Sequence, residues 1–324
     1  MKAARYTRYG PPEVVQIVDV ENPLLKDDEV LIKVRAASVN PYDWHFMRGD
    51  PYLIRIPAGG LHGPKDPRLG ADVAGQVEVV GNSVTQFKVG DEIFGCCKGA
   101  FAEYACAPPA RLALRPANVT AEQAAAIPIA ALTALQALRD KGNVQAGQKV
   151  LVNGAAGGVG TFGVQLAKLF GAMVTGVCST RNVEMVRSIG AERVTDYTQQ
   201  DFTREAERYD MILDCVGNRT LSEFRRILQP RGVYVGAGGS SDKWMLGPMS
   251  RAIRQKILSL FGRQKLSGIL ANINAADLAF VGDLVKAGKI KPVIDSRYPL
   301  TEIREAISYI EEGHARGKVI ITFA

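Results

Sequence analysis

The chain has 324 residues, of which 47% are hydrophobic and 23% charged, and its formal net charge is +7. These are values of a globular protein, and the length exceeds what one hydrophobic core usually serves, so we expect two domains. No apolar run is long enough to span a membrane, no signal-peptide pattern opens the chain, and the five cysteines include no C-x-x-C pair. We therefore expect a cytoplasmic protein with reduced thiols. Because the basic residues are scattered and no nucleic-acid-binding motif is present, we expect no nucleic-acid partner.

The first part of the chain reads as β-rich. Strands are predicted at 14–20, 29–36, 73–80 and 101–107, with glycine and proline between them. The pattern then changes to a helix predicted over 121–138, followed by alternating strands and helices. Such alternation predicts a parallel sheet with helices on both faces.

The last part of the chain predicts a return to the first domain. Its expected elements are a helix, a strand, a helix and a strand at 275–287, 293–298, 301–312 and 318–323. We therefore expect a first domain at 1–122 that is completed by 273–324, and a second at 123–272.

The most informative segment is 149–160, with the sequence KVLVNGAAGGVG. It predicts a short apolar strand, a glycine-rich turn and a helix. A pyrophosphate can bind at a helix N-terminus where no Cβ blocks the backbone and unpaired N–H groups point at it. An ordinary tight turn of an α/β unit is the alternative. The residues that we expect to contact a dinucleotide here are Gly154, Ala156, Gly157, Gly158, Val159 and Gly160.

The residues after the next strand, predicted at 172–178, point to the kind of dinucleotide. NAD-binding units place an acid near this position for the ribose 2′-hydroxyl. This chain has Ser179, Thr180 and Arg181 instead, and Tyr197 follows on a third strand near Val194. Two hydroxyls and a guanidinium favour a 2′-phosphate, so NADPH is the expected cofactor. The alternative for Arg181 is a solvated residue at a helix start.

Several motifs together resemble one known family. They lie at 1–4, 11–14, 38–43, 69–75, 88–95, the glycine turn and 313–319. The chain resembles the medium-chain dehydrogenase/reductases, and within them the zinc-independent NADPH:quinone oxidoreductase and enone reductase branch. The resemblance implies an α/β fold: a GroES-like β-rich substrate domain and a Rossmann cofactor domain with a doubly wound parallel sheet. It also implies a cleft between the two domains and a homodimer through the edges of the Rossmann sheets.

The zinc-independent branch is indicated by what this chain lacks. The resemblance implies that zinc-dependent members carry a cysteine at position 40, a histidine at position 71 and a four-cysteine lobe. This chain has Asn40 and Ala71, and it has no such lobe. Zinc needs three or four soft or imidazole ligands brought together, and neither Asn nor Ala supplies one, so we expect no metal.

Without a metal to polarise a carbonyl, hydride transfer to a quinone or to the β-carbon of an enone needs the least help. The negative charge that gathers on the substrate oxygen would be stabilised by nearby donors. The resemblance implies that Asn40 lines the cleft and can donate to this oxygen, and Tyr42 and Asp43 are further catalytic candidates. The alternative is structural: Asn40, Pro41 and Asp43 also make a good helix start, and for Asp43 we favour this capping role.

The resemblance and the ends of the predicted strands supply further cofactor contacts. Thr133 lies where family members contact the cofactor, although a buried helix hydroxyl is the alternative. Residues after two apolar strands lie at the edge where α/β sheets bind ligands. Lys318 belongs to the family's closing motif and is either a cofactor contact or a solvated lysine. The contacts expected after the two strands are Cys215, Val216, Gly236 and Gly238.

Residues 242–270 depart from shorter family members. From Met249 the apolar positions recur every four residues beside several basic ones, which predicts a basic amphipathic helix. Such a helix could cover the substrate cleft, which we favour, or make a weak contact with an anionic membrane surface.

The leading hypothesis is thus an NADPH-dependent reductase of a quinone or enone. Two alternatives stay open on the sequence. One is an enoyl-thioester reductase that holds a carrier phosphate with the basic insertion. The other is a non-catalytic NADPH-binding sensor or partner protein.

Overall fold

The computed structural model describes residues 1–238, 255 and 263–323. It forms two compact units, which we call unit 1 (Met1–Leu132 with Ile273–Ala324) and unit 2 (Thr133–Asn272). The first boundary lies at 132 rather than at the expected 122, and the return to unit 1 lies at 273 as expected.

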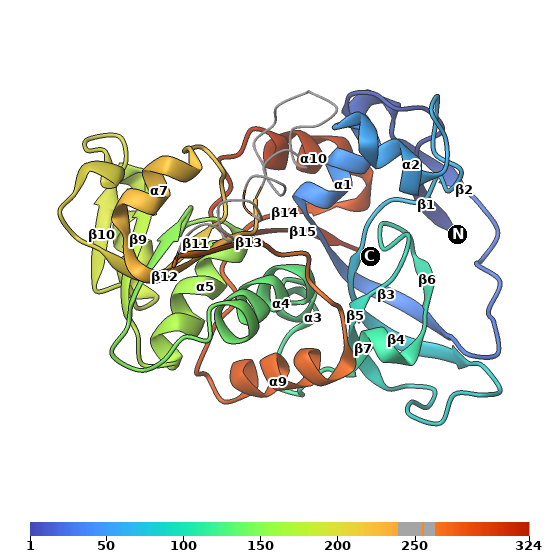
Figure 1. The fold of residues 1–324 in the computed structure, drawn as a ribbon. Helices are drawn as coiled ribbons and strands as arrows, with labels where there is room; N and C mark the ends of the chain where they lie inside the picture. Colours follow the sequence, from blue (N-terminus) through green and yellow to red (C-terminus); the bar gives the residue numbers. More distant parts are fainter. Residues whose placement is uncertain (239–254, 256–262, 324) are drawn as a thin grey trace. The chain divides into compact units, whose positions relative to one another are not determined.

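Unit 1 is built on a seven-stranded sheet in the order β14-β15-β3-β4-β5-β7, with β6 paired to β3 (Figure 1). Only β14 and β15 pair in parallel; the other pairs are antiparallel. A separate antiparallel pair joins β1 and β2. The strands are β1 (Lys2–Arg5), β2 (Gln16–Asp19), β3 (Val30–Val39), β4 (Asp72–Val80), β5 (Glu92–Cys96), β6 (Tyr104–Ala107), β7 (Leu112–Leu114), β14 (Ile294–Pro299) and β15 (Lys318–Thr322).

Short helices connect and cover these strands. Helix α3 packs against β3, β4 and β5, and α10 packs against β14, β15 and α1. The α-helices are α1 (Pro41–Arg48), α2 (Arg55–Ala58), α3 (Ala121–Ala125), α9 (Ala275–Lys286) and α10 (Ile303–Glu311). Short 3-10 turns lie at Pro12–Val14, Tyr52–Ile54, Pro109–Arg111 and Leu300–Glu302.

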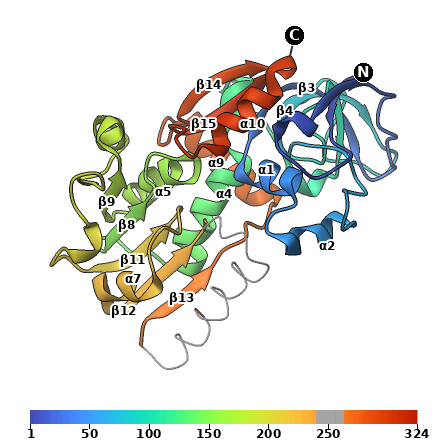
Figure 2. The same ribbon diagram turned by 90° about the horizontal axis from the view of Figure 1, so that it is seen from above.

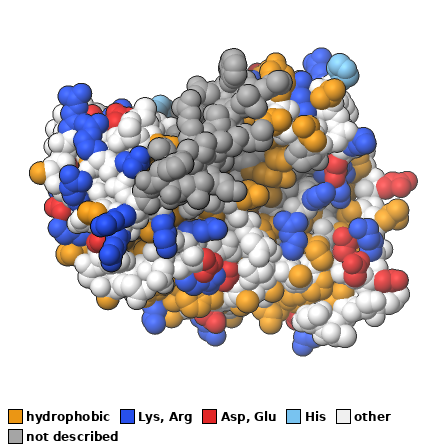
Figure 3. All heavy atoms as spheres, in the orientation of Figure 1, with side chains coloured by type: hydrophobic (Ala, Val, Ile, Leu, Met, Phe, Trp, Pro, Cys, Tyr) orange, Lys and Arg blue, Asp and Glu red, His pale blue; other side chains and the backbone are white. Residues whose placement is uncertain are grey.

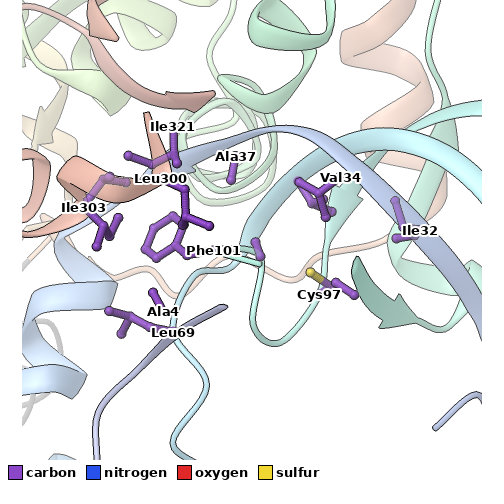
Figure 4. Packing of buried hydrophobic residues seen from close by; sticks show 14 of the residues in the cluster. Ala4, Ile32, Val34, Ala37, Leu69, Cys97, Phe101, Leu300, Ile303 and Ile321 are labelled. Carbon is purple, nitrogen blue, oxygen red and sulfur yellow. The ribbon is translucent and has the colours of Figure 1, made fainter. Parts of the chain in front are cut away.

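The core of unit 1 joins residues far apart in the sequence. Phe101, which is completely buried, belongs to the same cluster as Ala4 near the start of the chain and Ile321 near its end. Figure 4 shows Phe101, Leu300 and Ile303 close together in this cluster. The C-terminal segment is therefore part of this core, as the sequence pattern predicts, because its consecutive apolar residues Val319, Ile320 and Ile321 are all buried.

Unit 2 holds a six-stranded sheet in the order β10-β9-β8-β11-β12-β13, in which every neighbouring pair is parallel. Figure 2 shows β11, β12 and β13 running side by side. This order, with the chain reversing direction across the sheet between β8 and β11, confirms the Rossmann-type arrangement. The strands are β8 (Lys149–Asn153), β9 (Met173–Cys178), β10 (Arg193–Asp196), β11 (Tyr209–Asp214), β12 (Leu228–Gly236) and β13 (Lys265–Gly268).

Helices connect the strands of unit 2. Helix α5 (Gly158–Leu169) packs on β8 and β9, α6 (Val183–Ser188) on β9 and β10, and α7 (Leu221–Ile227) on β12. A π-helical turn, Ala137–Lys141, and 3-10 turns at Thr180–Asn182 and Phe202–Arg204 complete the connections.

Two expected elements differ from the structure. The single helix predicted over 121–138 is interrupted, because Pro128 has no N–H to continue it. Helix α3 ends at Ala125, and a second helix, α4 (Pro128–Gln136), begins at the proline. The boundary between the units falls within α4, after Leu132. Most of the basic amphipathic helix expected within 242–270 falls outside the described residues. Its described end is different, since Lys265 opens the edge strand β13.

Across the described residues, no helix is both long enough and apolar enough to pass through a bilayer.

Candidate functional site

The strand order of unit 1 brings three distant polar residues together. Because β15, β3 and β4 are neighbours, the start of β15, the end of β3 and the start of β4 meet at one edge of the sheet. Asn40 follows β3, Asp72 opens β4, and Lys318 opens β15. All three side chains are buried. We call Asn40, Asp72 and Lys318 the polar triad.

The polar triad is joined by direct contacts. Lys318 Nζ donates to Asn40 Oδ1 at 2.6 Å and to Asp72 Oδ2 at 3.3 Å. Asn40 Nδ2 donates to the same Asp72 oxygen at 2.9 Å. Ser38 Oγ also donates to Asp72 Oδ2 at 2.9 Å. A buried cation is thus balanced by a buried carboxylate, the condition under which such charges are tolerated.

The hydrogen-bonding capacity of Asn40 is used within unit 1. Its second amide hydrogen is directed at the carbonyl of Ser38, where Nδ2 and the oxygen are 3.3 Å apart. An asparagine side chain has two N–H donors, so both are engaged. Lys318 has three, of which the structure assigns two. In this arrangement Lys318, rather than Asn40, holds a donor for a further acceptor.

Asp43 caps the helix that follows Asn40, as the capping role favoured from the sequence predicts. Its Oδ2 accepts the backbone N–H of Asn40 at 2.7 Å, and Pro41 is the first residue of α1. Asp43 is completely buried, and its Oδ1 has no hydrogen-bond partner. Burial raises the pKa of Asp43 to about 7, against the opposing effect of the Asn40 N–H, and the Asp72 carboxylate raises it further.

Tyr42 lies on the more open side of α1. Its side chain is 47% exposed, and its ring lies 4.3 Å from that of Phe46. Burial raises the pKa of its phenol, so the hydroxyl stays protonated at neutral pH.

The polar triad does not have the chemistry of a zinc site. Its centre is an ammonium group, and its other members are a primary amide and one carboxylate. Cys96 Sγ donates to Asp72 Oδ1 at 3.4 Å, and burial raises the pKa of this thiol well above its usual range. In the part of the chain that the structure describes, no three His, Cys, Asp or Glu side chains are grouped so that they could hold a metal ion.

In unit 2 the glycine turn has the geometry that a pyrophosphate needs. Gly154 has φ +80°, a conformation that favours glycine, and Gly157 is the N-cap of α5. A Cβ on Gly160 would lie 2.0 Å from the carbonyl oxygen of Gly154, so no other residue fits there. Gly158 and Val159 open the helix, and Ala156 precedes it in the turn. The backbone N–H groups at this helix start can receive an anion.

Two further segments expected at the cofactor site lie against this turn. A Cβ on Gly154 would lie 2.6 Å from Val216, and a Cβ on Gly238 would lie 2.3 Å from the carbonyl oxygen of Cys215. The ends of β8, β11 and β12 therefore converge. Val216 is 40% exposed, and burial raises the pKa of the Cys215 thiol. Gly236, the last residue of β12, accepts the backbone N–H of Ile269.

Asp214 holds these strand ends together, although the sequence analysis assigned it no role. Its Oδ1 accepts Asn153 Nδ2 at 2.8 Å and the backbone N–H of Gly217 at 2.9 Å, and its Oδ2 accepts the Tyr234 hydroxyl at 2.6 Å. The signal was an acid at the end of an apolar strand, followed at the third position by a glycine. Asp72 was missed in the same way, as an acid that opens the apolar strand 73–80.

The predicted ribose-phosphate residues also come together. The backbone N–H of Tyr197 donates to the carbonyl of Cys178, which places Tyr197 beside Ser179. Arg181 is exposed on the 3-10 turn that follows. The Thr180 hydroxyl is engaged by a neighbour, because it donates to Asp196 Oδ2 at 2.6 Å. Ser179 Oγ accepts from Asn182 Nδ2 at 3.2 Å, so the predicted residues lie together at the ends of β9 and β10, within a local hydrogen-bond network.

Two residues predicted to contact the cofactor are buried. Thr133 lies on α4 and is 7% exposed, and Lys318 is 3% exposed within the polar triad. Lys318 is therefore neither a solvated lysine nor a residue with a free side chain, since it is bonded to Asn40 and Asp72.

Comparisons with known proteins agree with this architecture. Residues 26–117 match the alcohol dehydrogenase GroES-like domain, and residues 189–321 match a family described as zinc-binding dehydrogenase. A chloroplast envelope quinone oxidoreductase homolog of Arabidopsis thaliana is 36% identical, and the match covers 99% of this chain and 98% of the relative. An NADPH-dependent alkenal/one oxidoreductase of the same plant is 32% identical over 99% of this chain and 79% of its own.

A solved structure has the same fold. The quinone oxidoreductase from Coxiella burnetii is 30% identical and superposes with a TM-score of 0.89, covering 100% of this chain and 99% of its own. The chain belongs to the medium-chain dehydrogenase/reductase family, in the group that contains the quinone and alkenal/one oxidoreductases.

Proposed function

We propose that this protein is a cytoplasmic, zinc-independent reductase that transfers a hydride from NADPH to a quinone or an α,β-unsaturated carbonyl. The observation that carries the proposal is the glycine turn closed by Gly154 and Gly160, with Ser179, Arg181 and Tyr197 gathered at the ends of the next two strands. The names of the relatives favour the same reaction class.

The choice of NADPH over NADH rests on charge. Arg181 offers a guanidinium where a 2′-phosphate would be held, and Ser179 and Tyr197 offer hydroxyls. Asp196 lies near the same strand ends and is satisfied by Thr180 and Thr198, which lower its pKa. Its charge opposes a phosphate, so the preference for NADPH depends on Arg181.

The proposal that no zinc takes part rests on the polar triad. The ammonium of Lys318 supplies a positive charge beside Asp72 that a metal ion would otherwise supply. When bound, NADPH provides the hydride. The chain's task is then to stabilise the negative charge that hydride addition places on the substrate oxygen.

We assign this stabilisation to Lys318 and a positioning role to Asn40 and Asp72. Asn40 accepts one N–H of Lys318, and Asp72 accepts another, so the ammonium is held in one orientation. The remaining N–H is available to an oxyanion.

A homodimer is part of the proposal, since β13 is an edge strand of the unit 2 sheet and its outer side could pair with a second copy.

The reaction itself is tested with the purified protein, by following NADPH oxidation with a panel of benzoquinones, naphthoquinones, short enones and enoyl-thioesters. We expect turnover with a quinone or an enone. Turnover with enoyl-thioesters alone would contradict the assigned substrate class, and tight NADPH binding without any turnover would contradict an enzymatic role.

Changing Lys318 to Met should lower kcat by about 100-fold while changing the Kd for NADPH by less than about threefold, because the lost cation acts on the transition state. The substitution also leaves Asp72 buried and unpaired, which costs about 3–5 kcal/mol of unfolding free energy. The double variant Lys318→Met with Asp72→Asn removes both charges and should recover stability without recovering kcat. Steady-state kinetics and denaturant unfolding measure both effects; normal kcat in the double variant would contradict the role of Lys318.

Changing Arg181 to Ala should weaken NADPH binding by about 10- to 100-fold, since a charge-assisted hydrogen bond contributes about 1.5–3 kcal/mol. NADH binding should stay almost unchanged. Arg187→Ala, an exposed arginine on the following helix, is the matched control, and Asp196→Asn should shift the preference in the opposite direction, toward NADPH. Calorimetric Kd values decide this; an equal loss for both cofactors in Arg181→Ala would make the 2′-phosphate assignment wrong.

Asp43 should make folding stability depend on pH. Its pKa is about 7 in the folded protein and near 3.8 when unfolded, so the folded state binds more protons between these values. Stability from this group is therefore fully present below pH 3.8 and is lost as the pH rises to about 7. Between pH 5 and 7 the loss is about 2–3 kcal/mol. Asp43→Asn keeps an acceptor for the Asn40 N–H and should lack this slope; identical pH profiles of the two proteins in urea unfolding would contradict the assignment.

A further inference from the structure

A second candidate binding site lies in unit 2, away from the glycine turn. It is an open pocket of about 470 Å³ lined by Ser222, Arg225, Arg226, Pro230, Arg263 and Gln264. Ser222, Arg225 and Arg226 lie along α7, Pro230 lies near the start of β12, and Arg263 and Gln264 come just before β13. In a parallel sheet the strand starts and the strand ends lie at opposite edges, and the glycine turn follows the end of β8. The pocket therefore lies at the other edge of the sheet from the proposed cofactor site. We call it the arginine pocket.

The arginines at the end of α7 are not needed to satisfy the helix terminus. Basic side chains in a last turn often bond the free carbonyls there. Here Gln264 Nε2 donates to the carbonyl of Arg225 at 3.0 Å and to that of Gln229 at 3.2 Å. Arg208 Nη1 donates to the carbonyl of Arg226 at 2.8 Å. The carbonyls are thus capped by other residues, and the guanidiniums of the pocket are left for another acceptor.

The pocket is positively charged and partly preorganised. Arg225 Nε donates to Gln264 Oε1 at 3.0 Å, which fixes one guanidinium at the rim. Arg226 and Arg263 are exposed, and within the described ranges their side chains make no hydrogen bond or ion pair. None of the described residues that line the pocket is a carboxylate. The one acid on α7, Glu223, accepts from the backbone N–H and the hydroxyl of Thr220 at the start of the helix. Figure 3 shows Lys and Arg side chains gathered on the face where α7 and β12 lie in Figure 1.

We propose that the arginine pocket binds a phosphate ester. Guanidiniums match phosphate oxygens with paired, charge-assisted hydrogen bonds, and three of them around one hollow leave a positive field that a dianion neutralises. The Ser222 hydroxyl lies 2.9 Å from the Thr220 hydroxyl, which itself donates to Glu223, so Ser222 is engaged there and the guanidiniums supply the donors. The volume lies within the range of small-molecule sites and exceeds what one phosphate fills, so the ligand carries more than the phosphate group. The same chemistry is offered by a soluble phosphate ester and by the headgroup of an anionic lipid. The proposal does not depend on the reaction assigned above.

The test is calorimetric titration of the NADPH-saturated protein with inorganic pyrophosphate, so that the glycine turn is already occupied. We expect one site per chain, weakened by added salt. The variant Arg226→Gln with Arg263→Gln should weaken pyrophosphate binding at least about tenfold, the loss of two charge-assisted contacts. Arg225 is left in place because it is bonded to Gln264. The matched control, Arg187→Gln with Arg204→Gln, removes the same charge from exposed arginines of unit 2 and should change binding by less than about twofold.

A second arm separates the two sources of the phosphate. Sedimentation with vesicles of phosphatidic acid in phosphatidylcholine, against pure phosphatidylcholine, reports headgroup binding. Vesicle binding that the pocket variant loses and the control keeps supports a lipid ligand, and pyrophosphate binding alone supports a soluble ester. NADPH-dependent turnover should be the same in both variants, which separates this site from the catalytic one. Equal binding by the pocket variant and its control, or no binding of either probe, would overturn the proposal.

Discussion

A buried cation organises the polar edge of the unit 1 sheet. Lys318 arrives from the last strand of the chain and is held by Asn40 and Asp72, which come from two other strands. A lysine is rarely buried unless a carboxylate balances it, so the three residues depend on one another for stability. The same dependence fixes the direction of the ammonium, which is the condition for electrostatic catalysis by a preorganised group. The stability of this edge of the sheet and the chemistry that we propose for it therefore rest on the same contacts.

Unit 2 is organised differently. Its central group is a carboxylate, and this carboxylate binds backbone and neutral side-chain donors. Asp214 accepts hydrogen bonds from Asn153, Gly217 and Tyr234, so it ties the ends of β8, β11 and β12 into one surface. On that surface, glycines at 154 and 160 let the backbone approach closely enough to receive a pyrophosphate. The arginine pocket, at the other edge of the same sheet, has no such backbone cradle and relies on side-chain charge.

The sequence predicted the fold class, the glycine turn and the return of the C-terminal segment to unit 1, because periodic apolar residues and glycines carry those features locally. It also predicted that Asp43 caps α1, since the cap lies within four consecutive residues. It could not predict the polar triad, whose members are separated by up to 278 positions and meet only through strand order. For the same reason the sequence predicts that Asn40 donates to the substrate oxygen, whereas in the structure its amide N–H groups donate to Asp72 and Ser38. Thr180 is likewise predicted to contact the phosphate, whereas in the structure its hydroxyl donates to Asp196. The sequence shows Pro128, but it did not reveal that this proline begins a second helix and does not lie inside a single long one.

In the reaction that we propose, a hydride moves from NADPH to carbon or oxygen of an activated carbonyl. The most direct measurement uses NADPH deuterated at C4, in each of its two stereochemical forms, with an enone that NADPH reduces in the protein's presence. We expect one of the two forms to deliver a single deuterium to the β-carbon of the product, and we expect this transfer to be lost in the Lys318→Met, Asp72→Asn double variant. Product without deuterium from either form, or NADPH that binds and is never oxidised, would contradict it.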